Sequence, residues 1–242
     1  MSMHWHTYAS AEKAAEACCR NILPCLEEAV SGHGQAKIAF SGGSTPKFLF
    51  QALAQSGFDW KQVHVFWVDE RAVPPSDPES NFLLAEEYFL KPAHVPLRNI
   101  HRIQAELRPD VAAENYAQEI EEVFGLQEGE LPHFDVIHLG IGADAHIASL
   151  FPGEPLIHNR EGIASSVYVE KLGKWRVTLL PGVLLNAKRI VMLAAGEDKA
   201  EAIRNVMEAP YDPNLLPAQL ISHHGRHVSW FVDTAAAALT SV

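Results

Sequence analysis

One histidine stands among small residues near the middle of the chain. The stretch GIGADAHIASLFPG (140–153) follows the apolar run FDVIHL (134–139) and contains a single imidazole, that of His146, two residues beyond Asp144. Glycines allow tight turns, and imidazole titrates near neutral pH, so a histidine on such a turn is a candidate general base. A lone histidine is nevertheless more often structural than catalytic, and the residue pattern leaves both interpretations open.

The same stretch contains GIGADA, which fits the loose G-x-G-x-x-A pattern of a dinucleotide-binding loop. No clean strand ending in an acidic residue follows about 20 residues later, as the ribose contact of such a loop requires. We therefore interpret the glycines as a turn that presents His146.

A second glycine-containing segment, SGGSTP (41–46), follows the apolar run QAKIAF. Backbone N–H groups and hydroxyls at the start of a helix suit a phosphate group, and Pro46 suits the first helical turn. The segment lacks the Gly-Lys-Ser/Thr ending of a Walker A loop. A tight strand-to-helix turn would explain the segment equally well. The candidate phosphate ligands are Ser41, Gly42, Gly43, Ser44 and Thr45.

Charged residues follow other apolar runs. Asp69 and Arg71 come directly after VHVFWV (63–68), Lys199 falls in the first turn of a predicted helix, and Arg176 lies in a predicted hairpin. A lysine at a helix N-terminus opposes the helix dipole, a mild cost that makes sense if it reaches toward an anion. The alternative is that these residues form surface ion pairs and solvated charges, which is the commoner situation.

The elements that must position these residues alternate along the chain. Predicted strands occupy 35–43, 63–71, 134–142, 189–197 and 227–233, and a hairpin joins 165–172 to 175–180. Predicted helices occupy 10–30, starting at Ser10 and stopping at Gly32, and 46–56, 80–90, 110–124 and 197–207. This alternation is typical of an α/β fold, here one three-layer, Rossmann-like domain (1–242) with a mainly parallel sheet and helices on both faces. Ligands of such sheets bind beyond the carboxyl ends of the strands, where the residues above gather.

Composition narrows the class of protein. The chain has 242 residues, 48% of them hydrophobic, and a net charge of −11 without a basic stripe, so we expect no nucleic-acid partner. No apolar run approaches the about 20 residues that span a bilayer, and no signal peptide is expected. Cys18, Cys19 and Cys25 fit neither a disulfide framework nor a zinc site, which favours a cytoplasmic location. The histidines of HHGRH (223–227) match no metal motif, and we expect those at 4 and 6 to lie in a frayed terminus.

Taken in order, several motifs resemble one family. SGGSTP, WVDERAVP with a following SN, GIGADAHIASLFPG, WRVTLLPGVLLNAKRIVMLAAGEDKA and SWFVD together resemble 6-phosphogluconolactonase over about residues 36 to 233. The resemblance implies an α/β domain related to the glucosamine-6-phosphate deaminases and ribose-5-phosphate isomerases. It implies hydrolysis of 6-phospho-D-glucono-1,5-lactone to 6-phosphogluconate in the oxidative pentose phosphate pathway, with no cofactor and no metal. We expect a monomer or a weak dimer.

The deaminases share the phosphate and histidine loops but usually carry a catalytic glutamate where this chain has Phe151, and Asp-Glu-Tyr where it has Asp-Glu-Arg at 69–71. Both differences favour the lactonase. The chain also departs from the lactonase pattern. Ala145 replaces a usual glycine, which strains the backbone if that position needs a positive φ, and Leu180 replaces a usual threonine.

The resemblance and the residue types suggest a division of roles. We expect His146 to act as general base toward water, with Asp144 or Asp69 fixing its tautomer, and Arg71 to stabilise the oxyanion. Lys199 and Arg176 would then meet the phosphate on the 42–44 loop. Three alternatives stay open: a deaminase-like isomerase, a non-catalytic sugar-phosphate sensor, and, more distantly, a metal hydrolase.

Overall fold

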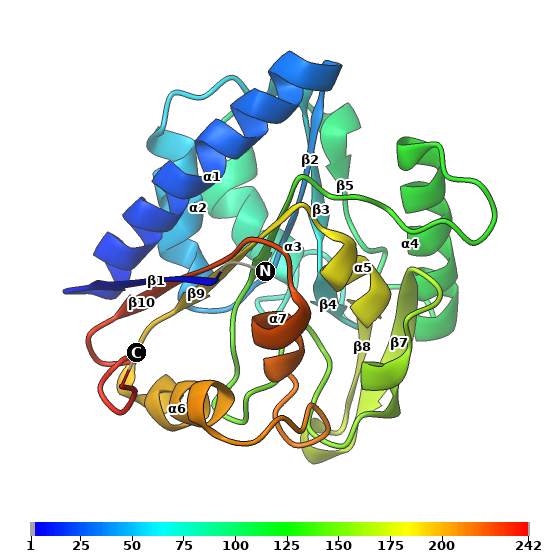
Figure 1. The fold of residues 1–242 in the computed structure, drawn as a ribbon. Coiled ribbons are helices and arrows are strands. Elements are labelled where there is room, and N and C mark those ends of the chain that lie inside the picture. Colours follow the sequence, from blue (N-terminus) through cyan, green and yellow to red (C-terminus); the bar gives the residue numbers. More distant parts are fainter. Residues whose placement is uncertain (1–2, 242) are drawn as a thin grey trace.

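The computed structural model describes residues 3–241, and a parallel sheet forms its centre (Figure 1). The seven strands lie in the order β1-β10-β9-β6-β2-β3-β5, and every neighbouring pair is parallel. All carboxyl ends of these strands therefore meet at one edge. The strands are β1 (Met3–Tyr8), β2 (Ala36–Phe40), β3 (Val63–Trp67), β5 (Ile100–His101), β6 (Val136–Leu139), β9 (Arg189–Ala194) and β10 (Val228–Asp233).

A small antiparallel sheet extends from the carboxyl edge. It consists of β4 (Asp69–Arg71), β8 (Lys174–Leu179) and β7 (Ala164–Val169), in the order β4-β8-β7. The chain passes from β3 into β4 with only Val68 between them, so the small sheet is anchored directly to the large one. The β7–β8 hairpin turns through a short 3-10 segment, Glu170–Leu172.

Helices cover both faces of the parallel sheet, with α1 and α2 on one side and α4, α5 and α7 on the other (Figure 1). The central strands β2, β3, β6, β9 and β10 are mostly buried, as central parallel strands must be, whereas the edge strand β1 is largely exposed. No helix among residues 3–241 combines the length and apolar character needed to cross a bilayer. The helices are α1 (Ala11–His33), α2 (Pro46–Gln55), α3 (Asn81–Ala85) with a π-helical turn after it (Glu86–Leu90), α4 (Pro109–Phe124), α5 (Pro181–Asn186), α6 (Ala200–Glu208) and α7 (Gln219–His224).

The predicted fold class and the hairpin are confirmed, and a strand forms within each of the five predicted strand segments. The segment 63–71 is not one strand, however, because it divides at Val68 into β3 and β4, which belong to different sheets. Ser10 begins α1 as predicted, because its hydroxyl accepts a hydrogen bond from the Lys13 N–H. The predicted stop at Gly32 is wrong. The helix continues to His33, and Gly34 caps it. Gly34 adopts the left-handed conformation, with a φ of 82°, and its N–H donates to the Val30 carbonyl.

The N-terminal segment also differs from its prediction. His4 and His6 lie in strand β1, which pairs in parallel with β10, and not in a frayed end. The His6 ring stacks on Phe231 at 5.2 Å. The sequence of β1, MHWHTY, contains the strand-favouring residues Trp5, Thr7 and Tyr8, a signal that the prediction of a frayed terminus overlooked.

Candidate active site

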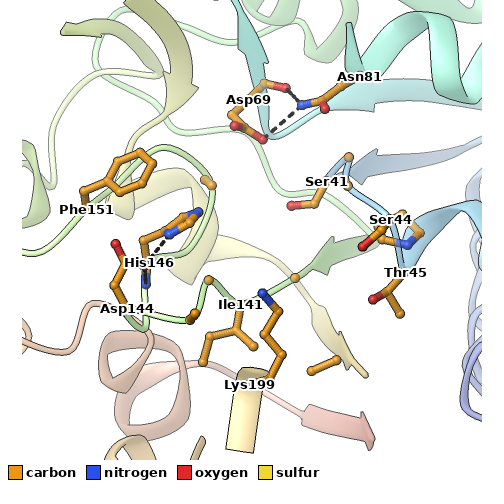
Figure 2. A pocket seen from close by; sticks show the side chains of 18 of the residues that line it. Ser41, Ser44, Thr45, Asp69, Asn81, Ile141, Asp144, His146, Phe151 and Lys199 are labelled. Atoms are coloured by element: carbon orange, nitrogen blue, oxygen red, sulfur yellow. Dashed lines mark hydrogen bonds and ion pairs between the residues drawn. The ribbon is translucent and has the colours of Figure 1, made fainter. Parts of the chain in front are cut away.

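A hollow of about 540 Å³ lies at the carboxyl edge of the parallel sheet (Figure 2). The loops that follow β2, β3, β6 and β9 form its walls, and the β7–β8 hairpin adds one more. The hollow brings together every residue that the sequence singled out for chemistry: Ser41, Gly42, Gly43, Ser44, Thr45, Asp69, Arg71, Asp144, His146, Arg176 and Lys199. Segments more than 150 residues apart in the chain therefore share one cavity.

The Ser41–Thr45 loop forms one wall. The Thr45 hydroxyl does not cap α2, so it is left to face the hollow, where Figure 2 shows it beside Ser44. Gly43 has a φ of 118°, which a residue with a side chain rarely adopts. A Cβ on Gly42 would lie 1.8 Å from Oδ1 of Asn81, so only glycine fits against that side chain. The loop thus presents backbone and hydroxyl donors at the start of a ten-residue helix.

His146 lies on the opposite wall, on a tight turn after β6. The Ala145 N–H donates to the Gly142 carbonyl, and the Gly142 N–H donates to the His146 carbonyl, both at 2.9 Å. Ala145 has a φ of 65°, so the alanine sits in the strained conformation that the sequence raised as a possibility. The His146 ring stacks on Phe151, with 4.1 Å between the centroids.

The environment of His146 keeps its imidazole neutral. Burial lowers its pKa to about 4, and the nearby charges of Arg176, Lys199 and Arg71 act in the same direction, while Asp69 opposes them. At pH 7 the ring therefore carries one proton and one lone pair. A neutral imidazole is the form that can accept a proton.

The structure distinguishes the two carboxylates that the sequence left open as partners of His146. Oδ1 of Asp144 lies 2.5 Å from Nδ1 of His146, and Lys171 forms an ion pair with the other oxygen. A carboxylate paired with an ammonium group accepts hydrogen bonds, so Nδ1 of His146 donates and Nε2 keeps the lone pair. Asp69 instead accepts a hydrogen bond from the Ser149 hydroxyl at 2.8 Å.

Two arginines lie side by side on the small sheet. Arg71 on β4 and Arg176 on β8 are direct register partners, and both line the hollow. Within residues 3–241, the Nε atoms of both side chains are buried and have no hydrogen-bond partner. Burial and the neighbouring Arg71 lower the pKa of Arg176, while Asp69, 3.8 Å from its guanidinium, opposes this. Like charges opposite each other are unfavourable unless an anion joins them, so the pair is suited to an anionic ligand.

Lys199 is a third basic residue of the hollow, which Lys171 also lines. It ends the 3-10 turn Glu197–Lys199 that leads into α6, and its side chain is 23% exposed. Its ammonium lies 2.9 Å from a carboxylate oxygen of Asp198, and Figure 2 shows it pointing between His146 and the Ser41–Thr45 loop. The lysine thus lies between the two walls, in agreement with an anion-facing role.

Sequence reasoning missed several residues that shape the hollow. Glu70 is buried, and its carboxylate accepts hydrogen bonds from the N–H groups of Arg71, Asn81 and Phe82 and from the Ser80 hydroxyl. Burial raises the pKa of Glu70 in spite of these bonds. The only sequence signal was its position between Asp69 and Arg71, which does not separate a buried anchor from a solvated charge. Lys171 gave no signal beyond a predicted hairpin.

The histidines at 223–227 lie in different surroundings: His223 and His224 contact Tyr211, whereas His227 lines a separate hollow together with Cys25 and Asp135. Within residues 3–241, no cluster of three histidine, cysteine, aspartate or glutamate side chains is arranged to hold a metal ion. Nε2 of His224 instead lies 3.1 Å from the Tyr211 hydroxyl, and the His223 ring contacts the same tyrosine.

Comparisons with known proteins agree with one another. The family described as glucosamine-6-phosphate isomerases/6-phosphogluconolactonase matches residues 9–230. A 6-phosphogluconolactonase of Nostoc sp. is 36% identical over 222 residues, which cover 91% of each chain. Among solved structures, a 6-phosphogluconolactonase from Trypanosoma cruzi has a TM-score of 0.89 at 24% identity, covering 100% of this chain and 98% of that one. A monomeric glucosamine-6-phosphate deaminase has a TM-score of 0.81 at 20% identity, covering 99% and 100%.

Proposed function

This chain belongs to the family of glucosamine-6-phosphate isomerases and 6-phosphogluconolactonases, and we propose that it hydrolyses 6-phospho-D-glucono-1,5-lactone to 6-phosphogluconate in the oxidative pentose phosphate pathway. The observation that carries the proposal is the shared hollow. A neutral imidazole lies on one wall and a phosphate-type loop on the other, with four basic side chains between and beside them. The similarity to the Nostoc lactonase supports the same conclusion.

In the proposed mechanism His146 is the general base. Its Nε2 takes a proton from water as the water oxygen bonds to C1 of the lactone, and the carbonyl oxygen becomes an oxyanion. The C1–ring-oxygen bond then breaks, and the proton passes from the imidazolium to the departing ring oxygen. The products are a carboxyl group and a hydroxyl group, so atoms and charges balance. Asp144 holds Nδ1 throughout and stabilises the transient imidazolium.

The basic groups divide between the two charged parts of the substrate. Arg71 lies next to Asp69 and opposite Arg176, and we assign it to the oxyanion. Lys199 and Arg176 meet the 6-phosphate, which rests on the backbone N–H groups of residues 42–44 and on the hydroxyls of Ser41, Ser44 and Thr45. Fixing the phosphate orients C1 toward His146. Asp69 positions Arg176, since its carboxylate contacts the Ser149 hydroxyl, the Asn81 amide and the Arg176 guanidinium and not the imidazole.

The related deaminase activity is the alternative within the family. Phe151 stacks on the imidazole where a deaminase usually has its catalytic glutamate, so the hollow lacks a carboxylate at that position. To decide between the two activities, the purified protein is incubated with freshly prepared lactone and, in a separate assay, with glucosamine-6-phosphate. We expect proton release from the lactone well above the spontaneous rate and no ammonia from the amino sugar. Ammonia release would establish the deaminase, and binding without either reaction would establish a sugar-phosphate sensor.

Other properties of the proposed enzyme follow the family. We propose that residues 1–242 act as one domain, as a monomer or weak dimer in the cytoplasm, without nucleic-acid or membrane partners. The reaction needs neither cofactor nor metal, because the imidazole and the cations supply the base and the charge stabilisation. Turnover that survives treatment with a chelator, together with the elution volume in size-exclusion chromatography, tests these points.

A further inference from the structure

Lys171 contacts both groups that hold the His146 ring. Its ammonium forms an ion pair with Oδ2 of Asp144, whose Oδ1 bonds Nδ1 of His146. The same ammonium lies 4.5 Å from the centroid of the Phe151 ring, on which the imidazole stacks. The Lys171 side chain therefore contacts both the carboxylate that fixes the tautomer of His146 and the aromatic ring that fixes the plane of its imidazole.

The position of Lys171 in the fold is equally specific. It lies in the 3-10 turn between β7 and β8, whereas Asp144 and His146 follow β6 in the large sheet. The β8 strand of the same hairpin carries Arg176 into the hollow. The Lys171–Asp144 pair is thus a contact between the small sheet and the loop of the proposed base.

We propose that Lys171 is a positioning residue: it holds Oδ2 of Asp144 so that Oδ1 faces Nδ1 of His146 and the lone pair stays on Nε2. This inference rests on the proposed role of His146 as base. Without the ammonium, the Asp144 carboxylate is free to rotate toward solvent, since its side chain is 29% exposed. The imidazole then loses its fixed donor partner, and both neutral tautomers become accessible.

Loss of Lys171 also changes the charge around the ring. Asp69 raises the pKa of His146, whereas Arg176, Lys199 and Arg71 lower it. Asp144 bonds the ring directly, and Lys171 offsets the negative charge of that carboxylate by pairing with it. Removing one cation from this set raises the proton affinity of the imidazole. Because the pKa of His146 is about 4, such a rise leaves the ring neutral at pH 7. Slower turnover in the variant therefore comes from the looser placement of the imidazole, without a change in the phosphate contacts.

The test compares Lys171→Met with Lys174→Met and Lys171→Arg. Lys174 lies on the same hairpin with a similar exposure but pairs with Glu79 at 2.5 and 2.6 Å, so its loss leaves Asp144 untouched. Two quantities are measured: the titration and ring-nitrogen NMR shifts of His146 in the free protein, and kcat and KM for the lactone. Thermal melting confirms that each variant is folded.

For Lys171→Met we expect about a tenfold increase in the proton affinity of His146, mixed tautomers and a kcat lowered by about 10- to 100-fold at unchanged KM. Lys171→Arg restores the tautomer, and Lys174→Met resembles the wild type. An unaltered His146 titration and tautomer in Lys171→Met would overturn the proposal, as would a raised KM at constant kcat, which indicates direct substrate binding. The NMR measurement uses no substrate, so a wild-type protein without lactonase activity refutes the proposed function separately.

Discussion

Replacing Gly142 by alanine should displace the proposed base without touching the phosphate loop. A Cβ at this position would lie 1.9 Å from Nδ1 and 2.2 Å from Cε1 of His146, and 2.6 Å from Oδ1 of Asp144. Ordinary contact begins near 3.4 Å, so the imidazole must move by about 1.5 Å. Gly142 does not have a positive φ, so alanine fits the backbone and the effect comes from the side chains alone.

A displacement of about 1 Å in a catalytic group costs on the order of 100-fold in rate. We therefore expect kcat of Gly142→Ala to fall by at least about 100-fold, equivalent to about 2.7 kcal/mol of transition-state stabilisation. KM should change by less than about threefold, because the phosphate contacts lie on the opposite wall. The assay is proton release from fresh lactone at constant pH, corrected for spontaneous hydrolysis.

Gly32→Ala is the matched control. Nothing lies within 4 Å of a Cβ at Gly32, which sits inside α1 and far from the hollow. This variant should keep full activity and gain about 0.5–1 kcal/mol in the free energy of unfolding. If Gly142→Ala remained folded and turned over the lactone within threefold of the wild-type rate, the placement of His146 against Gly142 would not matter for catalysis, and the reasoning would be refuted.

Three further predictions concern charge and burial. Lys199→Ala should raise KM by about 10- to 100-fold, because a charge-assisted hydrogen bond to the phosphate contributes about 1.5–3 kcal/mol to binding. A fall in kcat at constant KM would contradict this role. NMR titration should show the His146 ring neutral down to about pH 5, because burial lowers its pKa to about 4, and a midpoint near 6.5 would contradict the buried environment. His138 is fully buried, and neither of its ring nitrogens has a hydrogen-bond partner among the described residues. His138→Leu should therefore raise the free energy of unfolding at pH 7 by about 1–3 kcal/mol. A loss of stability in urea unfolding would contradict this. Burial also lowers the pKa of His138 to about 3. Between about pH 6.5 and 3 the unfolded state therefore binds this proton and the folded state does not, so His138 makes stability fall as the pH falls, by at most about 1.4 kcal/mol per unit. His138→Leu should make this fall shallower without abolishing it, because burial also lowers the pKa values of His64 and His146 to about 4.

The sequence was enough to predict that the candidate site residues lie close together, because one topological rule applies to parallel sheets. Residues that follow parallel strands come to the same edge, whatever their separation in the chain. His146 and the Ser41–Thr45 loop follow β6 and β2, which are neighbours in the sheet. The strand runs were visible as short apolar segments, so the sequence was enough to place both groups at this edge.

The contacts of individual side chains were not predictable in the same way. The choice between Asp144 and Asp69 depends on the Ser149 hydroxyl, which is 80 positions from Asp69 and engages it only in the folded chain. The stop of α1 depends on which of Gly32 and Gly34 adopts a positive φ, and both are compatible with a helix end. Strand β1 pairs with the edge that β10 offers, a tertiary contact that the short segment MHWHTY does not specify by itself in spite of its strand-favouring residues.

The general-base role of His146 is tested most directly by single-turnover and steady-state hydrolysis with His146→Gln, a variant that keeps a polar side chain of similar size. We expect a kcat lower by about 100- to 10,000-fold, with KM within a few-fold of the wild type and an unchanged melting temperature. Turnover close to that of the wild-type protein would show that the imidazole does not draw the proton from water, and the proposed mechanism would fail.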